Sequence, residues 1–184
     1  MKDFHRDHPG FSQCGLNCLL CPMNLGGYCP GCGGGEGNQS CAVARCAMER
    51  NAGEFCSACP QFPCERLVKM GEYDSFLPHS RMFRDLERAE ELGLESYMTQ
   101  LEERRAILDR LLAGYNDGRR KSFYSLAACL LEPEDLRRAF DELQSVVTAD
   151  MTVKEKAITA VEILKKAAQA GGVTLKLNKK PKEK

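Results

Sequence analysis

The pattern of apolar and polar residues changes near residue 65, and the chain beyond it has the spacing of amphipathic helices. From there to about residue 172, Leu, Ala, Met and Phe recur every three or four positions among charged residues. The pattern predicts a single helical turn over residues 65–70 and longer helices over residues 81–92, 95–113, 122–131, 134–147 and 153–170. The predicted fold class is therefore mainly α, with these helices forming a bundle.

Several residues mark the expected ends of these helices. Ser80 is a suitable N-cap for the helix over 81–92, and Gly93 a suitable stop. Pro133 opens the helix that follows it, because proline is tolerated in a first turn. Thr152 and Glu155 have the spacing of a capping box, in which each side chain bonds the backbone of the other.

The last residues of the chain have a different pattern. Residues 173–177 alternate apolar and polar side chains, which predicts one short C-terminal strand. A lone strand is marginal in water, so we expect it to pair with another segment or chain. Residues 178–184 are rich in lysine and are predicted to form a disordered basic tail.

The chain before residue 65 lacks helical periodicity and is rich in cysteine instead. Ten of the eleven cysteines fall within 51 residues, and six of them form three Cys-x2-Cys pairs. The ten candidate metal ligands are Cys14, Cys18, Cys21, Cys29, Cys32, Cys41, Cys46, Cys56, Cys59 and Cys64. The eleventh, Cys129, lies in an apolar stretch and is predicted to be a small core residue.

The spacing of these cysteines is typical of zinc sites. A Cys-x2-Cys pair lets two thiolates reach one ion from a single turn, and backbone amides of that turn can donate to the sulfurs. Zinc takes four ligands in a tetrahedron, so two pairs complete one site. Few apolar residues lie between the cysteines, so metal has to supply the folding energy. We predict a small, irregular, zinc-knuckle-like metal-binding module that holds two or more zinc ions.

The spacing leaves the sharing of the ten thiols among the ions open. One partition places the first four thiols of the pairs on one ion: Cys18, Cys21, Cys29 and Cys32. A second ion would then take the next four in the chain: Cys41, Cys46, Cys56 and Cys59. Cys14 and Cys64 would be alternates or members of a third site, and an interleaved arrangement is equally open.

Disulfides and an iron–sulfur cluster are the two alternatives to zinc for these cysteines. The N-terminus lacks an apolar core of signal-peptide length, and no run approaches the roughly 18 apolar residues of a membrane span. The expected location is therefore cytoplasmic, without a membrane partner, where thiols stay reduced and disulfides are rare. The ten thiols also suffice for an iron–sulfur cluster, which is the alternative cofactor.

The cysteine stretch also resembles a known family. Residues 14–22, 29–32 and 55–65 resemble cysteine segments of an uncharacterised bacterial and archaeal family, domain of unknown function 3795, and residues 117–124 resemble a weaker feature of it. That family is described as cysteine-rich and zinc-binding, with no established activity. The resemblance covers residues 12–66 best. It implies metal at the matched cysteines and supplies no catalytic residue.

The charge balance and the small number of histidines weigh against nucleic-acid binding and against some classes of enzyme. Acidic and basic residues balance at 26 each, and residues 1–64 hold four basic against five acidic side chains. A nucleic-acid-binding zinc module needs several Lys or Arg contacts, so the balance weighs against that alternative without excluding it. With His5, His8 and His79 as the only histidines, no Ser-His-Asp order is evident, and no phosphate-binding glycine loop occurs.

The sequence thus predicts three parts: a metal-binding module over residues 1–66, a helical domain over 67–172, and a strand with a basic tail over 173–184. The predicted function is a zinc-binding protein that acts as a structural or protein-interaction module, with an unidentified protein partner. The alternatives are an iron–sulfur redox protein or enzyme component and a nucleic-acid-binding zinc module. No catalytic residue is predicted, and enzymatic activity would require an ion with an open coordination position.

Overall fold

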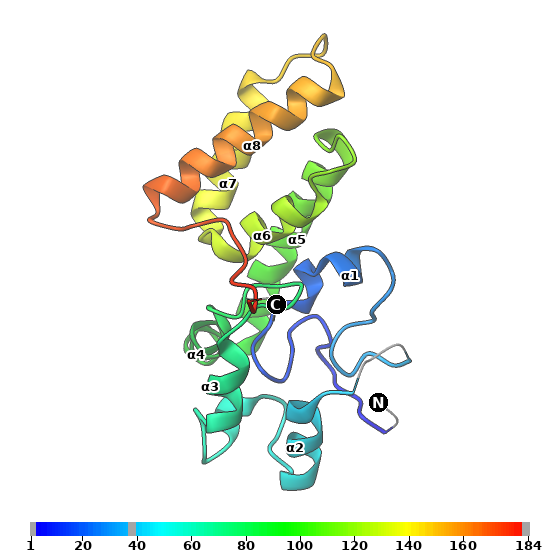
Figure 1. The fold of residues 1–184 in the computed structure, drawn as a ribbon, viewed down its shortest axis with the longest axis vertical. Helices are drawn as coiled ribbons and strands as arrows, with labels where there is room; N and C mark the ends of the chain where they lie inside the picture. Colours follow the sequence, from blue (N-terminus) through cyan, green and yellow to red (C-terminus); the bar gives the residue numbers. More distant parts are fainter. Residues whose placement is uncertain (1–2, 37–39, 182–184) are drawn as a thin grey trace. The chain divides into compact units, whose positions relative to one another are not determined.

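A computed structural model describes residues 3–36 and 40–181 (Figure 1). The chain divides into two compact units. The first holds the residues up to Thr99 together with the segment from Leu177 onward, and the second holds Gln100–Lys176. These bounds differ from the predicted ones at residues 66 and 172. The helices just after the cysteines are compact with the cysteine stretch, and Asn178 in the C-terminal segment bonds the loop after α3.

The second unit is built from helices. It contains most of α5 (Leu94–Gly114), which begins in the first unit, and all of three further helices: α6 (Lys121–Leu130), α7 (Pro133–Val146) and α8 (Val153–Ala170). Helices α7 and α8 lie side by side in Figure 1. The unit's core consists of large apolar side chains that are almost fully buried, among them Leu108, Leu111, Tyr124, Leu136 and Leu143. Burial of this apolar surface is the main driving force for its folding.

The first unit contains the cysteines and shorter helices. Within the cysteine stretch lie η1 (Cys18–Leu20), α1 (Pro22–Leu25), α2 (Ala42–Arg50) and η2 (Cys56–Ala58); α3 (Glu65–Gly71) and α4 (Met82–Leu92) follow. Its core combines Phe11 and Leu20 with Leu67 of α3 and Met82 and Leu86 of α4. A small part of this core is thus contributed by residues before Cys14, and most by residues after Cys64.

The mainly helical fold class is confirmed, and the predicted helices agree with the observed ones to within two residues at each end. The capping box is present, because Glu155 N donates to Thr152 Oγ1 over 3.3 Å and Thr152 N to Glu155 Oε2 over 2.8 Å. Gly93 ends α4 as predicted, but Arg81 takes the N-cap position that was assigned to Ser80.

The predicted C-terminal strand is not confirmed. Residues 173–177 are irregular, and no strand occurs in residues 3–36 or 40–181. The next residue bonds a loop instead: Asn178 N donates to Asp74 Oδ2 over 2.7 Å, and Asp74 N donates to Asn178 O over 2.8 Å. These bonds satisfy the backbone without a strand partner. The predicted tail is thus held at Asn178 and Lys179, whose Nζ donates to Ser75 O, and residues 182–184 lie outside the described part.

Candidate metal centre

The structure places all ten clustered cysteines in the first unit. None of them, nor Cys129, forms a disulfide. Cys14 is buried, and the other nine are partly buried. Cys129 is buried in α6 of the second unit, as predicted for a core residue. The candidate donors are therefore ten cysteines without disulfides within one compact unit.

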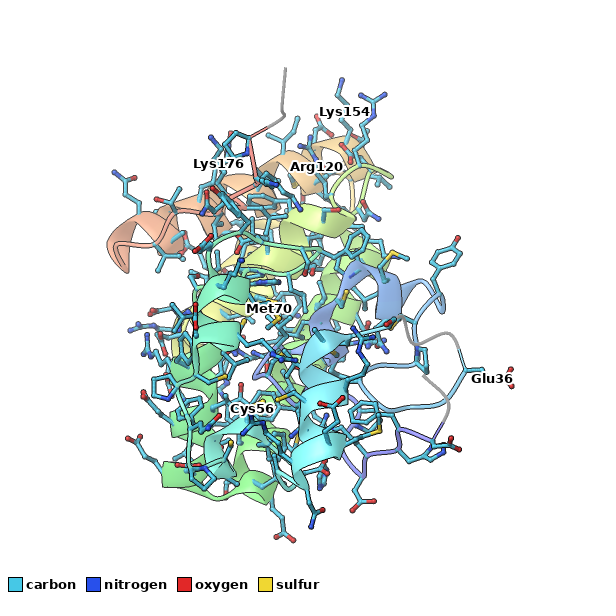
Figure 2. The ribbon with its side chains drawn as sticks, turned by 60° about the horizontal axis from the view of Figure 1, so that its bottom comes forward. Glu36, Cys56, Met70, Arg120, Lys154 and Lys176 are labelled. Atoms are coloured by element: carbon cyan, nitrogen blue, oxygen red, sulfur yellow. The ribbon has the colours of Figure 1, made fainter. Side chains whose placement is uncertain are left out.

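Four of these thiols line one pocket, here called the four-cysteine pocket. Its volume is about 30 Å³, and its cysteines are Cys46, Cys56, Cys59 and Cys64. They come from three neighbouring elements, namely α2, η2 with the residue after it, and the residue that precedes α3. Figure 2 labels Cys56 and Met70 in this unit. The pocket thus gathers thiols that are up to 18 positions apart in the sequence.

Local structure explains how the four thiols reach the pocket. Helix α2 buries Val43, Ala44 and Ala47, so Cys46 lies on the side of the helix that faces the core. The backbone of Cys56 is fixed by a bond from its N–H to the carbonyl of Gln13 over 2.8 Å. Cys59 follows one turn later, and its N–H donates to the carbonyl of Cys56 over 3.1 Å.

The remaining six thiols lie in the earlier part of the stretch, and Cys18 connects most of them. Its thiol interacts electrostatically with Cys32, Cys14, Cys21 and Cys29. Burial raises the pKa of Cys18 well above its ordinary value, and the neighbouring thiolates raise it further. Cys41 joins this group through its interactions with Cys14 and Cys32.

Burial opposes ionisation of several of these thiols. It raises the pKa of Cys14 to about 11, although the Ser12 hydroxyl at 3.1 Å acts in the opposite direction. It raises the pKa of Cys56 to about 12, with added repulsion from Cys14 and Cys64. A nearby divalent cation reverses this balance, because it favours the thiolate directly. The chemistry of the donor set therefore suits a thiophilic cation.

The thiols do not converge on a point in this structure. Within residues 3–36 and 40–181, no group of three or more His, Cys, Asp or Glu side chains is arranged to hold a metal ion. The four-cysteine pocket also differs from either set of the predicted partition, since it contains Cys64 and lacks Cys41. Metal binding by the ten cysteines stays a prediction.

Arg6 connects several parts of the cysteine module, and its pattern in the sequence did not indicate this role. Its side chain is 2% exposed and lies between the N-terminal arm, the Cys32 turn and the start of η2. Its Nη1 donates to Phe11 O over 2.6 Å, and its Nη2 donates to Glu54 O over 2.9 Å and forms an ion pair with the Glu54 carboxylate over 3.1 Å. The guanidinium also lies 4.9 Å from the centre of the Phe55 ring.

The N-terminal arm is consequently part of the fold. Phe4 is buried, and Arg6 N donates to the carbonyl of Gly33. Cys32 N donates to Pro9 O over 2.9 Å, which ties the second Cys-x2-Cys turn to the arm. At that turn Gly31 has φ +94°, and a β-carbon there would lie 2.3 Å from Pro9 O. Only glycine fits this position.

The structure also brings a histidine and a serine together. His79 is buried in the loop before α4, and its Nε2 lies 2.8 Å from Ser75 Oγ. Its Nδ1 lies 2.9 Å from Met70 O, and its backbone N–H donates to Asp74 Oδ1. These bonds hold the loop between α3 and α4. His5 is exposed and His8 partly buried, so neither forms part of a described metal site.

Comparisons with known proteins add no name or activity. No family model matches the chain, no curated protein matches it, and no solved structure matches it. The resemblance to the cysteine-rich family therefore stays an expectation. Among the described residues, no helix is long and apolar enough to span a bilayer.

Proposed function

We propose that the stretch from Cys14 to Cys64 binds two or more zinc ions and that the protein acts as a zinc-stabilised interaction module. The observation that carries this proposal is the gathering of four free thiols around one small pocket. Six further thiols in the same unit supply the donors for at least one other ion.

Zinc is supported by the type and number of donors. Thiolate sulfur is the commonest donor set of structural zinc, and four thiolates complete its tetrahedron. The free energy that this stretch needs in order to fold also supports metal binding. Among the described residues between Cys14 and Cys64, the large apolar side chains that are buried are Leu20 and Val43. Two such side chains give about 4 kcal/mol on burial, against roughly 1–2 kcal/mol per ordered residue in lost backbone entropy.

The interaction role is supported by exposed apolar side chains in the first unit. Tyr28, beside Cys29, is 73% exposed, and Phe76 is 59% exposed. Met48 of α2 is also largely exposed. Aromatic side chains of this kind are enriched at the centres of protein interfaces, where they contribute most of the binding energy. Residues 1–64 have slightly more acidic than basic side chains, which favours a protein partner over nucleic acid.

Metal analysis of the purified full-length chain tests the zinc part of the proposal. We expect zinc in preparations made both with and without oxygen. Zinc absent from both preparations would refute the proposal, and iron with visible absorbance in the anaerobic sample would establish the iron–sulfur alternative. For the interaction part, Tyr28→Ala is expected to weaken capture of a cross-linked protein partner without changing zinc content. A partner captured equally well would exclude Tyr28 from the interface.

A further inference from the structure

We propose that one zinc ion is held by the four-cysteine pocket alone, as a four-thiolate centre separate from the ion or ions of the other six cysteines. Its ligands are then Cys46, Cys56, Cys59 and Cys64. This assignment rests on the proposed function and resolves the ligand sharing that the sequence left open.

The composition of the pocket wall supports this assignment. Besides the four cysteines, the pocket is lined by aliphatic and aromatic residues, including Val43, Phe62 and Leu67, and by two arginines, Arg50 and Arg66. None of its lining residues is Asp, Glu or His. The metal donors available in the wall are therefore the four sulfurs, and their number equals the coordination number of structural zinc.

The pocket is small, with a volume of about 30 Å³, which is enough room for one ion. A single ion becomes bound when the four thiols turn toward the middle of the pocket, and a cysteine side chain does this by rotation about χ1. Cys56 already interacts electrostatically with the other three thiols.

Charge balance gives a second argument. A zinc ion with four thiolates has a net charge of −2, which is costly in an apolar pocket unless cations compensate it. Arg50 and Arg66 line the pocket and supply two positive charges. Arg66 is held in place by a bond from Nη1 to Ala42 O over 2.7 Å. Arg50 is exposed at the C-terminal end of α2 and lines the same pocket.

Cys14 is the nearest competitor for this ion. It interacts electrostatically with Cys56 and packs with Val43 and Leu67, which line the pocket. Cys14 itself does not line the pocket, and its sulfur lies 3.1 Å from Ser12 Oγ. The proposal predicts that Cys14 is dispensable for the ion in the four-cysteine pocket.

Zinc stoichiometry of cysteine-to-serine variants tests the assignment. Cys46→Ser and Cys64→Ser should each lose one zinc ion per chain relative to the unaltered protein. The double variant should lose the same one ion and no more, because both thiols bind it. Cys129→Ser is the matched control and should retain the full zinc content. Loss of two ions from the double variant, or different losses from the two single variants, would overturn the assignment.

A second measurement uses the unaltered chain, so it tests the assignment even if the cysteine-to-serine variants do not fold. In the unaltered zinc-loaded chain, the alkylation of each cysteine is followed by mass spectrometry while a chelator removes zinc. The four thiols should become reactive together, with one rate that differs from that of Cys18 and Cys32. If Cys46 became reactive together with Cys18 and before Cys64, the assignment would be wrong. Absence of zinc from the unaltered chain would instead refute the proposed function.

The arginines give an independent readout. Arg50→Gln and Arg66→Gln should each lower zinc affinity at this centre by about tenfold, the lower end for partners of metal ligands, and leave stoichiometry unchanged. Arg45→Gln, on the exposed side of α2, is the control and should leave affinity unchanged. Equal affinities for all three variants would show that the arginines do not balance the charge of the centre.

Discussion

The cysteine module of residues 14–64 and the helical unit of residues 100–176 bury different kinds of side chain. In the described part of the module, the interior contains sulfur, backbone and polar groups such as Asn17, with Leu20 and Val43 as its large apolar members. The helical unit instead buries many leucines together with Tyr124 and Phe140. Apolar burial drives folding of the helical unit, whereas the stretch from Cys14 to Cys64 buries few large apolar side chains of its own and is proposed to gain further free energy from metal.

Because of this difference, different changes should destabilise the two regions. Contacts in the helical unit are numerous, so the loss of one side chain removes only part of its stability. The module depends on a few strong interactions: the proposed metal bonds and the guanidinium of Arg6, which contacts the N-terminal arm and Glu54. We therefore expect treatments that act on metal or on Arg6 to affect the module selectively.

Removal of metal should have the largest effect. A structural zinc ion contributes on the order of 10 kcal/mol to folding, so chelation under reducing conditions should unfold the module. Hydrogen exchange followed by mass spectrometry should show loss of protection between Cys14 and Cys64, while α7 and α8 retain theirs. If protection fell equally in both regions, or stayed unchanged in the module, metal would not stabilise the module selectively.

A cavity in the helical unit should have the next largest effect. Leu136 of α7 is fully buried, and Leu136→Ala should lower the free energy of unfolding of this unit by about 4 kcal/mol. Ile158→Ala, at an exposed position of α8, is the matched control and should cost less than about 1 kcal/mol. Denaturant unfolding with hydrogen exchange measures both. A loss that appears in the module and spares α7 and α8 would contradict the expectation.

Replacement of Arg6 should destabilise the module by about 3 kcal/mol, because Arg6→Gln leaves the carbonyls of Phe11 and Glu54 without their donor. Arg45→Gln removes an exposed arginine and should change stability by less than about 0.5 kcal/mol. The measurement is the denaturant midpoint of the zinc-loaded protein. Equal midpoints for the two variants would show that the buried guanidinium contributes no more than a surface one.

Alkaline pH should have a smaller effect on the helical unit. Burial raises the pKa of Tyr124 to about 12, and its hydroxyl donates to Tyr115 O over 2.6 Å. Unfolded tyrosine loses its proton near pH 10. Between roughly pH 10 and pH 12 the unfolded state therefore binds fewer protons, and stability falls as the pH rises, by about 2 kcal/mol in total.

Tyr124→Phe isolates this titration. The variant lacks the hydroxyl, so its free energy of unfolding should be lower than that of the unaltered chain below about pH 10. Between roughly pH 10 and pH 12 its free energy of unfolding should fall less. Tyr28→Phe, at an exposed position, should behave like the unaltered chain. Stability curves that run parallel for all three proteins would show that Tyr124 does not titrate with folding.

The helices were predictable because their signals are local. Apolar spacing located α4 to α8, and Thr152 with Glu155 marked the start of α8. Helix α2 was missed because its nine residues lie between cysteines and carry only a short apolar stripe. The strand over 173–177 failed for a different reason. Alternation is typical of a half-buried strand but does not supply a partner, and in the structure Asn178 bonds the loop at Asp74.

Within the candidate site, cysteine spacing identified the donors but not their neighbours. Cys64 joins Cys46 in one pocket, although Cys41 is closer to Cys46 in the sequence. The reason is that α2 separates Cys41 at its N-terminus from Cys46 on its inner side. The burial of Arg6 was equally hidden, because an arginine next to a chain terminus is normally exposed, and only the folded chain places carbonyls around it.

X-ray absorption at the zinc edge of the purified full-length protein identifies the ligands of the bound ions. If cysteines alone hold zinc, each ion should have about four sulfur atoms at about 2.3 Å and no nitrogen or oxygen ligand. Ligands that are mostly oxygen or nitrogen would show that the cysteines do not hold the ion, and a folded module that contains no metal would show that zinc is not needed for its fold.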